Sequence, residues 1–270
     1  MKVSQTPKIS VLMSVRNGMP FLPQAVKSIL SQSYKNFEFI IIDDASADET
    51  WEYLKSQKDQ RIKLIKNSKN LGLAASLNKG LRLAKGDFIA RMDADDISLP
   101  NRLKIQLNYL QKHSRVDLCG CWVNLIDEKG ETIGEKKYPT ESDQVKKAIT
   151  WYTAVVHPTY MGKRDFFRKM KGYRLNFDYA EDYDLLARAK NKYTISNIPK
   201  KLLLWRLQQS RRSRENMAKM DRVVIAIKLE SLKRDGLTLM GILALIKKFT
   251  MTYCLPFPVK YKLAVLFKYA

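Results

Sequence analysis

Three aspartates, Asp93, Asp95 and Asp96, directly follow a short apolar run that begins after Gly86. The run at residues 88–92 is typical of a buried strand bounded by a glycine. A buried parallel strand delivers the residues after it to the carboxyl edge of the sheet, where open α/β sheets bind ligands. Side chains two positions apart point the same way along an extended chain, so we expect Asp93 and Asp95 to face one site.

Two neighbouring carboxylates repel each other unless a cation lies between them. Mg²⁺ and Mn²⁺ are hard ions that are held by one or two carboxylates together with substrate phosphates. The pair Asp93 and Asp95 therefore predicts a divalent metal site for a nucleoside diphosphate. Alternatively, these acids could cap the next helix, which we expect to begin near Ser98 and Pro100. One capping residue would satisfy that helix, so three carboxylates exceed its needs.

A second pair of acids, Asp43 and Asp44, ends the apolar run at residues 37–42. If both runs are parallel strands, their acids meet at the same edge of the sheet. A nucleotide pocket needs this arrangement, with one acid for the base or ribose and others for metal and phosphates. Ser46, with Glu49 three residues later, predicts a capping box for the helix that follows.

The elements that would position these acids alternate between strand and helix patterns. We expect strands at residues 9–15, 37–42, 62–66 and 88–92 and helices between them, including residues 20–32 and 72–84. This alternation predicts βαβ units and an α/β fold with a mostly parallel sheet. The first turn, residues 14–18, lacks the glycine spacing of a dinucleotide or P-loop site, which argues against both classes.

The chain has 270 residues, enough for one large α/β domain or a domain with an appendage. Cys119 and Cys121 are expected on one face of a strand, and Cys254 stands alone, so the cysteines favour a reducing, cytoplasmic compartment. The polar first eight residues do not resemble a signal peptide. The most apolar stretch, residues 237–246, is too short to span a membrane and ends at two lysines.

The net charge of +22 is concentrated toward the C-terminus. Residues 190–270 hold 18 Lys and Arg against 4 Asp and Glu, a balance of 18 − 4 = +14. Within them, residues 216–234, 239–249 and 259–269 have the pattern of basic amphipathic helices, which bind the surface of an anionic membrane. Alternatively, these helices could pack on the enzyme itself or on a second subunit of a homodimer.

Taken together, the motifs resemble the inverting family 2 glycosyltransferases of the GT-A fold, over residues 9–213. In that family, Met92 to Asp96 correspond to the Asp-x-Asp motif, so the resemblance implies that Asp95 and Asp93 hold Mn²⁺ or Mg²⁺. It also implies a nucleotide-sugar donor as partner and a Rossmann-like sheet flanked by helices. The implied donor-binding residues are Ser14, Arg16, Asn17, Asp43, Asp44, Asn70, Asn78 and Asp93.

Residues 180–188 resemble the Glu-Asp catalytic motif of the family. The resemblance implies that Asp182 is the general base, which takes the proton of the acceptor hydroxyl as it attacks the anomeric carbon. The metal would stabilise the departing nucleoside diphosphate. Glu181 and Asp182 also suit the first turn of a helix, and both interpretations are compatible. His157 resembles the family's acceptor-side segment, although a local hydrogen-bonding role is the alternative.

The sequence departs from the family at Gln208, where a histidine often follows the arginine by two residues. Glutamine is a poor metal ligand but can donate a hydrogen bond to phosphate. Arg206, Arg211 and Arg212 could neutralise the diphosphate, or form a solvated basic loop. The Gln-x-x-Arg-Trp motif and the membrane spans of processive members are not evident, which favours the addition of a single sugar.

We therefore expect an inverting, metal-dependent glycosyltransferase that moves one sugar from a UDP-sugar or similar donor to a hydroxyl of a saccharide or lipid-linked acceptor. The expected setting is the biosynthesis of capsule, other surface polysaccharide or lipopolysaccharide. We expect residues 1–213 to form the GT-A catalytic domain, with a donor half of about residues 1–100 and an acceptor half of about residues 101–213. Residues 214–270 would be a basic helical extension that holds a cytoplasmic enzyme peripherally on the inner membrane.

Two other functions are compatible with parts of the sequence. A sugar-phosphate nucleotidyltransferase uses a related sheet, but it would need a glycine-rich phosphate loop in place of residues 16–20. The charge alone would suit a nucleic-acid-binding protein. However, the basic residues lie mostly outside the predicted pocket, which is acidic and would repel a phosphate backbone. We therefore expect no nucleic-acid partner.

Overall fold

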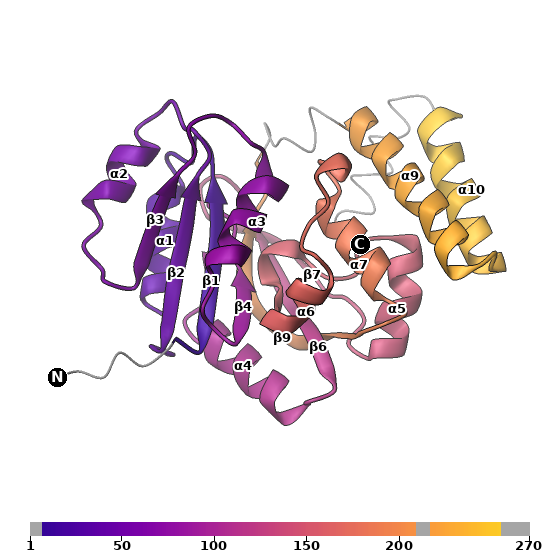
Figure 1. The fold of residues 1–270 in the computed structure, drawn as a ribbon, viewed down its shortest axis with the longest axis horizontal. Coiled ribbons are helices and arrows are strands. Elements are labelled where there is room, and N and C mark those ends of the chain that lie inside the picture. The colour runs from indigo at the N-terminus through magenta and orange to yellow at the C-terminus, as the bar shows by residue number, and fades with distance from the viewer. Residues whose placement is uncertain (1–6, 209–216, 255–270) are drawn as a thin grey trace.

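The computed structural model describes residues 7–208 and 217–254, and Figure 1 shows their arrangement. The first half of the chain builds four parallel strands in the spatial order β3-β2-β1-β4. Strands β1 and β2 are buried at every position, as expected where helices cover both faces of a parallel sheet. The predicted strands are confirmed: they are β1 (Ile9–Val15), β2 (Phe37–Asp43), β3 (Ile62–Lys66) and β4 (Phe88–Arg91).

The second half extends this sheet with antiparallel and parallel strands. Strand β8 pairs antiparallel with β4 on one side and with β6 on the other, while β6 and β9 are parallel. The sheet therefore has nine strands, in the order β3-β2-β1-β4-β8-β6-β9-β5, with β7 beside β6. Cys119 and Cys121 are fully buried in β6, as predicted. The strands of this half are β5 (Ile97–Ser98), β6 (Val116–Ile126), β7 (Thr132–Lys136), β8 (Met161–Lys163) and β9 (Thr194–Arg206).

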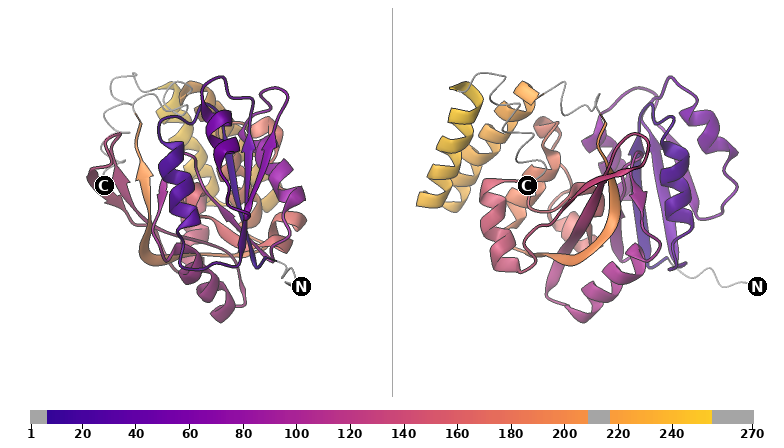
Figure 2. Two further views of the ribbon diagram at one scale, coloured as in Figure 1. Left: turned by 90° about the vertical axis from the view of Figure 1, so that its left-hand side faces the viewer. Right: turned by 180° about the vertical axis from the view of Figure 1, so that it is seen from behind.

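Helices cover both faces of the sheet and create two apolar clusters. Val11 and Met13 of β1 pack with α1 and α4 on one face, whereas Leu12 packs with α3 and α5 on the other. Figure 1 shows α3 in front of the parallel strands, and in the reverse view of Figure 2 it is α1 that lies in front of them. These helices are α1 (Leu22–Leu30), α2 (Thr50–Ser56), α3 (Leu73–Leu83), α4 (Arg102–Lys112), α5 (Ser142–Trp151), α6 (Arg164–Lys169) and α7 (Glu181–Ala189), with short 3-10 helices η1 (His157–Thr159) and η2 (Leu175–Phe177).

Two predicted helix starts are wrong. Helix α2 begins at Thr50, whose N–H donates to Asp48 Oδ1 at 3.1 Å, and Ser46 does not cap it. The Ser46 hydroxyl instead accepts the N–H of Asn17 at 3.0 Å, because the loops after β1 and β2 meet there. Similarly, Ser98 belongs to β5, and α4 begins after it at Arg102.

The C-terminal helices α9 (Met217–Asp235) and α10 (Leu239–Tyr253) lie side by side at the end of the molecule opposite α2 (Figure 1). Helix α9 packs on α7, and α10 packs on α9 and α5. Lys228 of α9 is buried, and its ammonium group donates to the Thr150 carbonyl at 2.6 Å and to the Tyr183 hydroxyl at 2.9 Å. Within the described residues, no helix combines the length and hydropathy needed to span a membrane. The boundary predicted at 213/214 and the helix predicted at 259–269 lie outside the described residues.

Candidate active site

A cavity of about 720 Å³ opens where β1 and β4 end, at the carboxyl edge of the parallel strands. This is the place where open α/β sheets bind ligands. Its wall combines the ends of the strands, the first turn of α7 and the C-terminal helices. Among the lining residues are Ser14, Arg16, Asn17, Asp93, Asp95, His157, Glu181, Asp182, Gln208, Met220, Val224 and Lys248.

The acidic cluster after β4 fits a divalent cation. Asp93, Asp95 and Asp96 each offer a carboxylate oxygen, and these oxygens lie within 4.8 Å of one another. Asp96 is fully buried and accepts the backbone N–H of Arg206 at 2.8 Å, so it anchors β9. Asp93 and Asp95 line the cavity. Two accessible carboxylates beside space for phosphate oxygens are a suitable ligand set for Mg²⁺ or Mn²⁺.

A buried arginine supports this cluster from below. Arg91, the last residue of β4, is 2% exposed and forms an ion pair with Asp93. Its positive charge also acts on His157 and on Asp182 across the cavity. The sequence reasoning did not single out Arg91, although an isolated charge inside an otherwise apolar strand pattern was a usable signal.

Asp182 lies in the first turn of α7 and lines the same cavity. Burial raises the pKa of its carboxyl to about 6, although the Tyr183 N–H at 2.7 Å and the charge of Arg91 oppose that shift, while Asp93 adds to it. At neutral pH the group is therefore mostly ionised, yet it is a stronger base than an ordinary aspartate. Such a carboxylate can accept a proton from an alcohol as that alcohol attacks.

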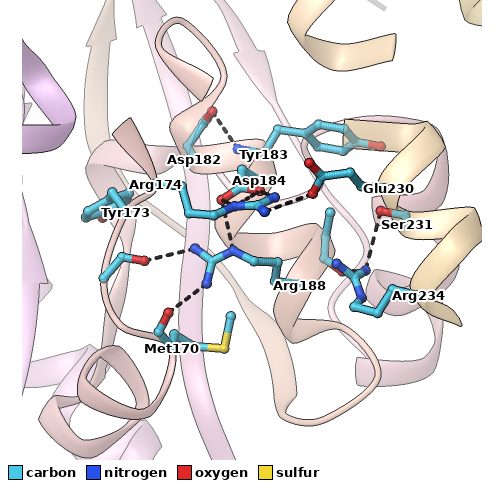
Figure 3. A network of polar contacts seen from close by, with 12 residues as sticks. Met170, Tyr173, Arg174, Asp182, Tyr183, Asp184, Arg188, Glu230, Ser231 and Arg234 are labelled. Carbon is cyan, nitrogen blue, oxygen red and sulfur yellow. Dashed lines mark hydrogen bonds and ion pairs between the residues drawn. The ribbon is translucent and has the colours of Figure 1, made fainter. Parts of the chain in front are cut away.

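The helix that bears Asp182 is held by a buried ionic network, shown in Figure 3. Asp184, whose side chain is fully buried, accepts hydrogen bonds from Arg188 at 2.9 Å and from Arg174 at 3.0 Å. Arg188 also donates to the Met170 carbonyl at 2.7 Å. Arg174 continues to Glu230 of α9 at 2.8 Å. The network therefore fixes α7 to the preceding loop and to the C-terminal helices.

His157 has a fixed orientation in the cavity wall. Its Nε2 lies 2.9 Å from the Tyr173 hydroxyl, and its ring packs edge-on against Tyr160 and Tyr173. Burial and the nearby charge of Arg91 lower the pKa of His157 well below its usual value, so the ring is neutral. These contacts match the local hydrogen-bonding alternative. Glu181 is also buried and lines the cavity beside Asp182.

On the donor side, Asn17 joins the loops after β1 and β2. It has a left-handed backbone conformation (φ 51°), and its Oδ1 accepts the N–H of Ala47 at 2.9 Å. This contact complements the bond from the Asn17 N–H to Ser46. Ser14 and Arg16 flank the same turn and line the cavity. The loops after β1 and β2 therefore meet beside the cavity.

Four other predicted donor residues make hydrogen bonds within the protein. Asp43 is fully buried and accepts the Ser46 N–H at 3.3 Å, whereas Asp44 accepts the N–H groups of Leu71 and Gly72, each at 2.8 Å. Asn70 accepts the N–H of Gly72 at 3.1 Å. Asn78 bonds to both the N–H and the carbonyl of Tyr173, at 2.9 and 2.7 Å. The described cavity wall does not include these four side chains, so their predicted contacts with the donor depend on the resemblance alone.

Arg206 is buried inside the protein, whereas Gln208 lines the cavity. Arg206 is 1% exposed, and its guanidinium donates to the carbonyls of Asp95 and Asp127 at 2.9 Å and to Gln24 Oε1 at 2.8 Å. It is therefore engaged inside the protein rather than offered to a diphosphate. Gln208 lines the cavity and donates from Nε2 to Asp95 Oδ2 at 2.7 Å. Arg211 and Arg212 lie outside the described residues.

Part of the cavity wall beyond the metal cluster was not predicted from the sequence. Aromatic side chains from several separate segments gather there, and α9 and α10 contribute Met220, Val224 and Lys248. Met220, Val224 and Lys248 belong to no local motif, because only the packing of α9 and α10 on α5 and α7 brings them to the site. The aromatic residues are Tyr138, Trp151, Tyr152, Tyr179 and Trp205.

Comparisons with known proteins agree with this arrangement. Residues 10–178 match the family described as Glycosyl transferase family 2. An uncharacterized glycosyltransferase, MJ1057 of Methanocaldococcus jannaschii, is 37% identical over 74% of this chain and 71% of its own length. The O-antigen biosynthesis glycosyltransferase WbnJ of Escherichia coli is 37% identical over 68% of this chain and 72% of its own length.

Two solved structures share the fold at low sequence identity. The crystal structure of S. aureus TarS 1–349 in complex with UDP-GlcNAc has a TM-score of 0.73 and 18% identity, over 91% of this chain and 73% of that one. The mannosyltransferase PcManGT of Pyrobaculum calidifontis, in complex with GDP-Man and Mn²⁺, has a TM-score of 0.65 and 17% identity, over 92% of this chain and 70% of that one.

Proposed function

The chain belongs to glycosyl transferase family 2, and from this premise we propose that it transfers one sugar from a nucleotide-diphosphate sugar to an acceptor hydroxyl with inversion. The observation that carries the proposal is the placement of Asp93 and Asp95 on one wall of a cavity that also holds Asp182. One wall suits a metal-bound diphosphate and the other offers a base. Inversion in one displacement needs both, on opposite sides of the reacting carbon.

In this mechanism Asp182 accepts the proton of the acceptor hydroxyl while the oxygen attacks the anomeric carbon. The bond from that carbon to the diphosphate oxygen breaks with its electron pair, so negative charge develops on the leaving group. Asp93 and Asp95 would hold the divalent cation, Mn²⁺ or Mg²⁺, which supplies stabilisation of that charge when bound. The buried Arg91 fixes Asp93 by their ion pair. Ser14, Arg16 and Asn17 would contact the nucleotide from the loop after β1.

Partners of similar proteins guide the choice of donor and acceptor. The complex of TarS with UDP-GlcNAc supports a UDP-sugar as the donor. The complex of PcManGT with GDP-Man supports a GDP-sugar as the alternative donor. The name of WbnJ supports an acceptor in O-antigen or related surface-polysaccharide biosynthesis. A saccharide or lipid-linked acceptor would pass the aromatic wall of the cavity, since sugar rings pack well on aromatic faces. We place the enzyme peripherally on the cytoplasmic face of the inner membrane.

Calorimetric titration of UDP, GDP and dTDP, with Mn²⁺ and with EDTA, tests the donor site directly. We expect one nucleotide to bind in the presence of Mn²⁺ and Asp95→Asn to weaken that binding more than about tenfold, because one of the metal's ligands is lost. Asp87→Asn is the matched control, since Asp87 is exposed at the other end of β4 and pairs with Lys8. Nucleotide binding that ignores both EDTA and Asp95→Asn would refute the proposed metal site.

A further inference from the structure

Among the described residues, helix α10 carries an apolar stripe that the other elements leave exposed. Large apolar side chains recur along it at spacings of three and four residues, which places them on one face. Their exposed fractions run from 37% to 74%. Scattered exposed apolar residues are ordinary, but a continuous stripe marks a surface that binds something. The stripe consists of Leu239, Ile242, Leu243, Ile246, Phe249 and Tyr253.

The other face of α10 is already occupied. Ala244 and Thr252 are buried at 3% and 9% exposure, and the helix packs against α9 and α5 there. Both helices lie at the margin of the molecule in the opposed views of Figures 1 and 2. The stripe is therefore not the face through which α10 joins the enzyme. No element in the described part of the chain covers it.

The part of the sequence that contains the stripe is positively charged, which favours a negatively charged partner. Residues 236–270 contain five lysines and no Asp or Glu. In α10, Lys247 lies 5.8 Å from the ring centre of Trp151, and Lys248 pairs with Asp221. Aliphatic and aromatic side chains together with lysines suit the headgroup boundary of an anionic bilayer. A nucleic acid would use the lysines but would leave the aliphatic side chains without a partner.

The same two helices also form part of the cavity wall. Met220 and Val224 of α9 and Lys248 of α10 line the cavity that contains Asp182. A surface that binds the outer face of α10 would therefore lie beside the acceptor side of the site. An acceptor anchored in that surface could reach the cavity without leaving it.

We propose that the apolar stripe of α10 binds the surface of an anionic lipid bilayer and thereby presents the cavity to a lipid-linked acceptor. This inference rests on the proposed function and deepens it, because it selects the lipid-linked class of acceptor over a free saccharide. The six side chains of the stripe enter the headgroup boundary. The exposed Lys247, next to Ile246, faces lipid phosphates, whereas Lys248 is turned toward Asp221 and the cavity. The affinity combines buried apolar area with charge attraction, so it depends on both lipid charge and salt.

Co-sedimentation with vesicles tests the surface. The full-length protein is mixed with vesicles of phosphatidylcholine, with and without phosphatidylglycerol. We expect binding to the anionic vesicles and about tenfold weaker binding for Ile246→Asp, since the variant loses an apolar side chain that the bilayer would bury and adds a repelled charge. Ile133→Asp is the matched control, because Ile133 is 41% exposed on β7 and lies outside the stripe, whereas Ile246 is 54% exposed.

Equal vesicle binding by Ile246→Asp and the wild type would overturn the proposal. Failure of the wild type to bind anionic vesicles would overturn it too. So would an oligonucleotide that displaces the wild type and every variant equally from the vesicles. Light scattering that shows a dimer lost in Ile246→Asp without any effect of lipid would assign the stripe to a second copy instead. Nucleotide titration in the presence of Mn²⁺ separates this test from that of the proposed function, since both variants should bind nucleotide as the wild type does.

Discussion

At the scale of single residues, the activity should depend on the ionisation of Asp182. Burial places the pKa of its carboxyl near 6, and only the ionised form can accept a proton. We expect kcat/KM to fall as the pH drops below about 6 and to level off above it, because the base is then ionised. A rate profile from pH 5 to 8 measures this limb. A profile that is flat through pH 5 would contradict the assignment.

Replacement of the same carboxylate gives a second test. Asp182→Asn keeps the size of the side chain and its acceptor oxygen for the Tyr183 N–H, but it removes the base. We expect transfer to fall by about 10²-fold or more, the usual contribution of a positioned base. Metal-dependent nucleotide binding, measured by calorimetry, should persist because Asp182 is not part of the acidic cluster that would hold the metal. A variant that retains most of its transfer rate would remove Asp182 from the mechanism.

Sequence motifs predicted the position of the site better than the roles of its individual residues. Asp93, Asp95 and Asp182 line one cavity, because the fold brings the end of β4 and the start of α7 together. Asp44 and Arg206 make hydrogen bonds within the protein. A sequence motif cannot predict these bonds because it does not specify the hydrogen-bond partners. Their oxygen and nitrogen atoms complete loops that only the folded chain brings together.

At the scale of elements, the position of α7 depends on the ion pairs of Asp184. Asp184→Ala would leave Arg174 and Arg188 without their shared carboxylate, although Arg174 keeps Glu230. Breaking a buried ion pair from one side costs about 3–5 kcal/mol, so we expect a loss of that order in the free energy of unfolding. Urea denaturation followed by circular dichroism measures it.

Asp165→Ala is the matched control for that substitution. Asp165 also pairs with two cations, Arg168 and Lys169, but the three side chains are exposed on α6. Solvent already screens such pairs, so their loss should change the urea midpoint little. Equal destabilisation by the two substitutions would mean that the burial of Asp184 adds nothing to stability. The network would then not be what holds α7 in place.

The elements themselves were predictable to different degrees. Strands β1 and β3 have the predicted bounds because each is a compact apolar run between polar segments. The three-residue strand β8 had no such run, and its antiparallel insertion between β4 and β6 makes the sheet mixed. The helix starts at α2 and α4 were misplaced because Ser46 and Ser98 bond to distant segments rather than to the adjacent turn. Tertiary contacts overrode local capping signals.

At the scale of the whole molecule, the C-terminal helices are continuous with the enzyme core. Ile227 of α9 is 1% exposed and belongs to the apolar cluster that contains α3, α5 and α7 residues. Lys228 beside it is buried among α5 and α7 groups, and burial lowers the pKa of its ammonium group to about 8. The charge pattern of the sequence suggested an extension, but it gave no indication of this packing.

This continuity predicts how the molecule unfolds. If α9 and α10 share the core, heating should melt the chain in one transition, in which tryptophan fluorescence and far-ultraviolet circular dichroism coincide. A bound nucleotide with Mn²⁺ should then stabilise the whole unit, by about 2.7 kcal/mol at a ligand concentration of 100 times Kd. EDTA should remove that gain, since the metal links the diphosphate to Asp93 and Asp95. Two separate transitions, of which nucleotide shifts only one, would instead show that the C-terminal helices fold as a unit of their own, because Asp93, Asp95 and the loop after β1 belong to the other part of the chain.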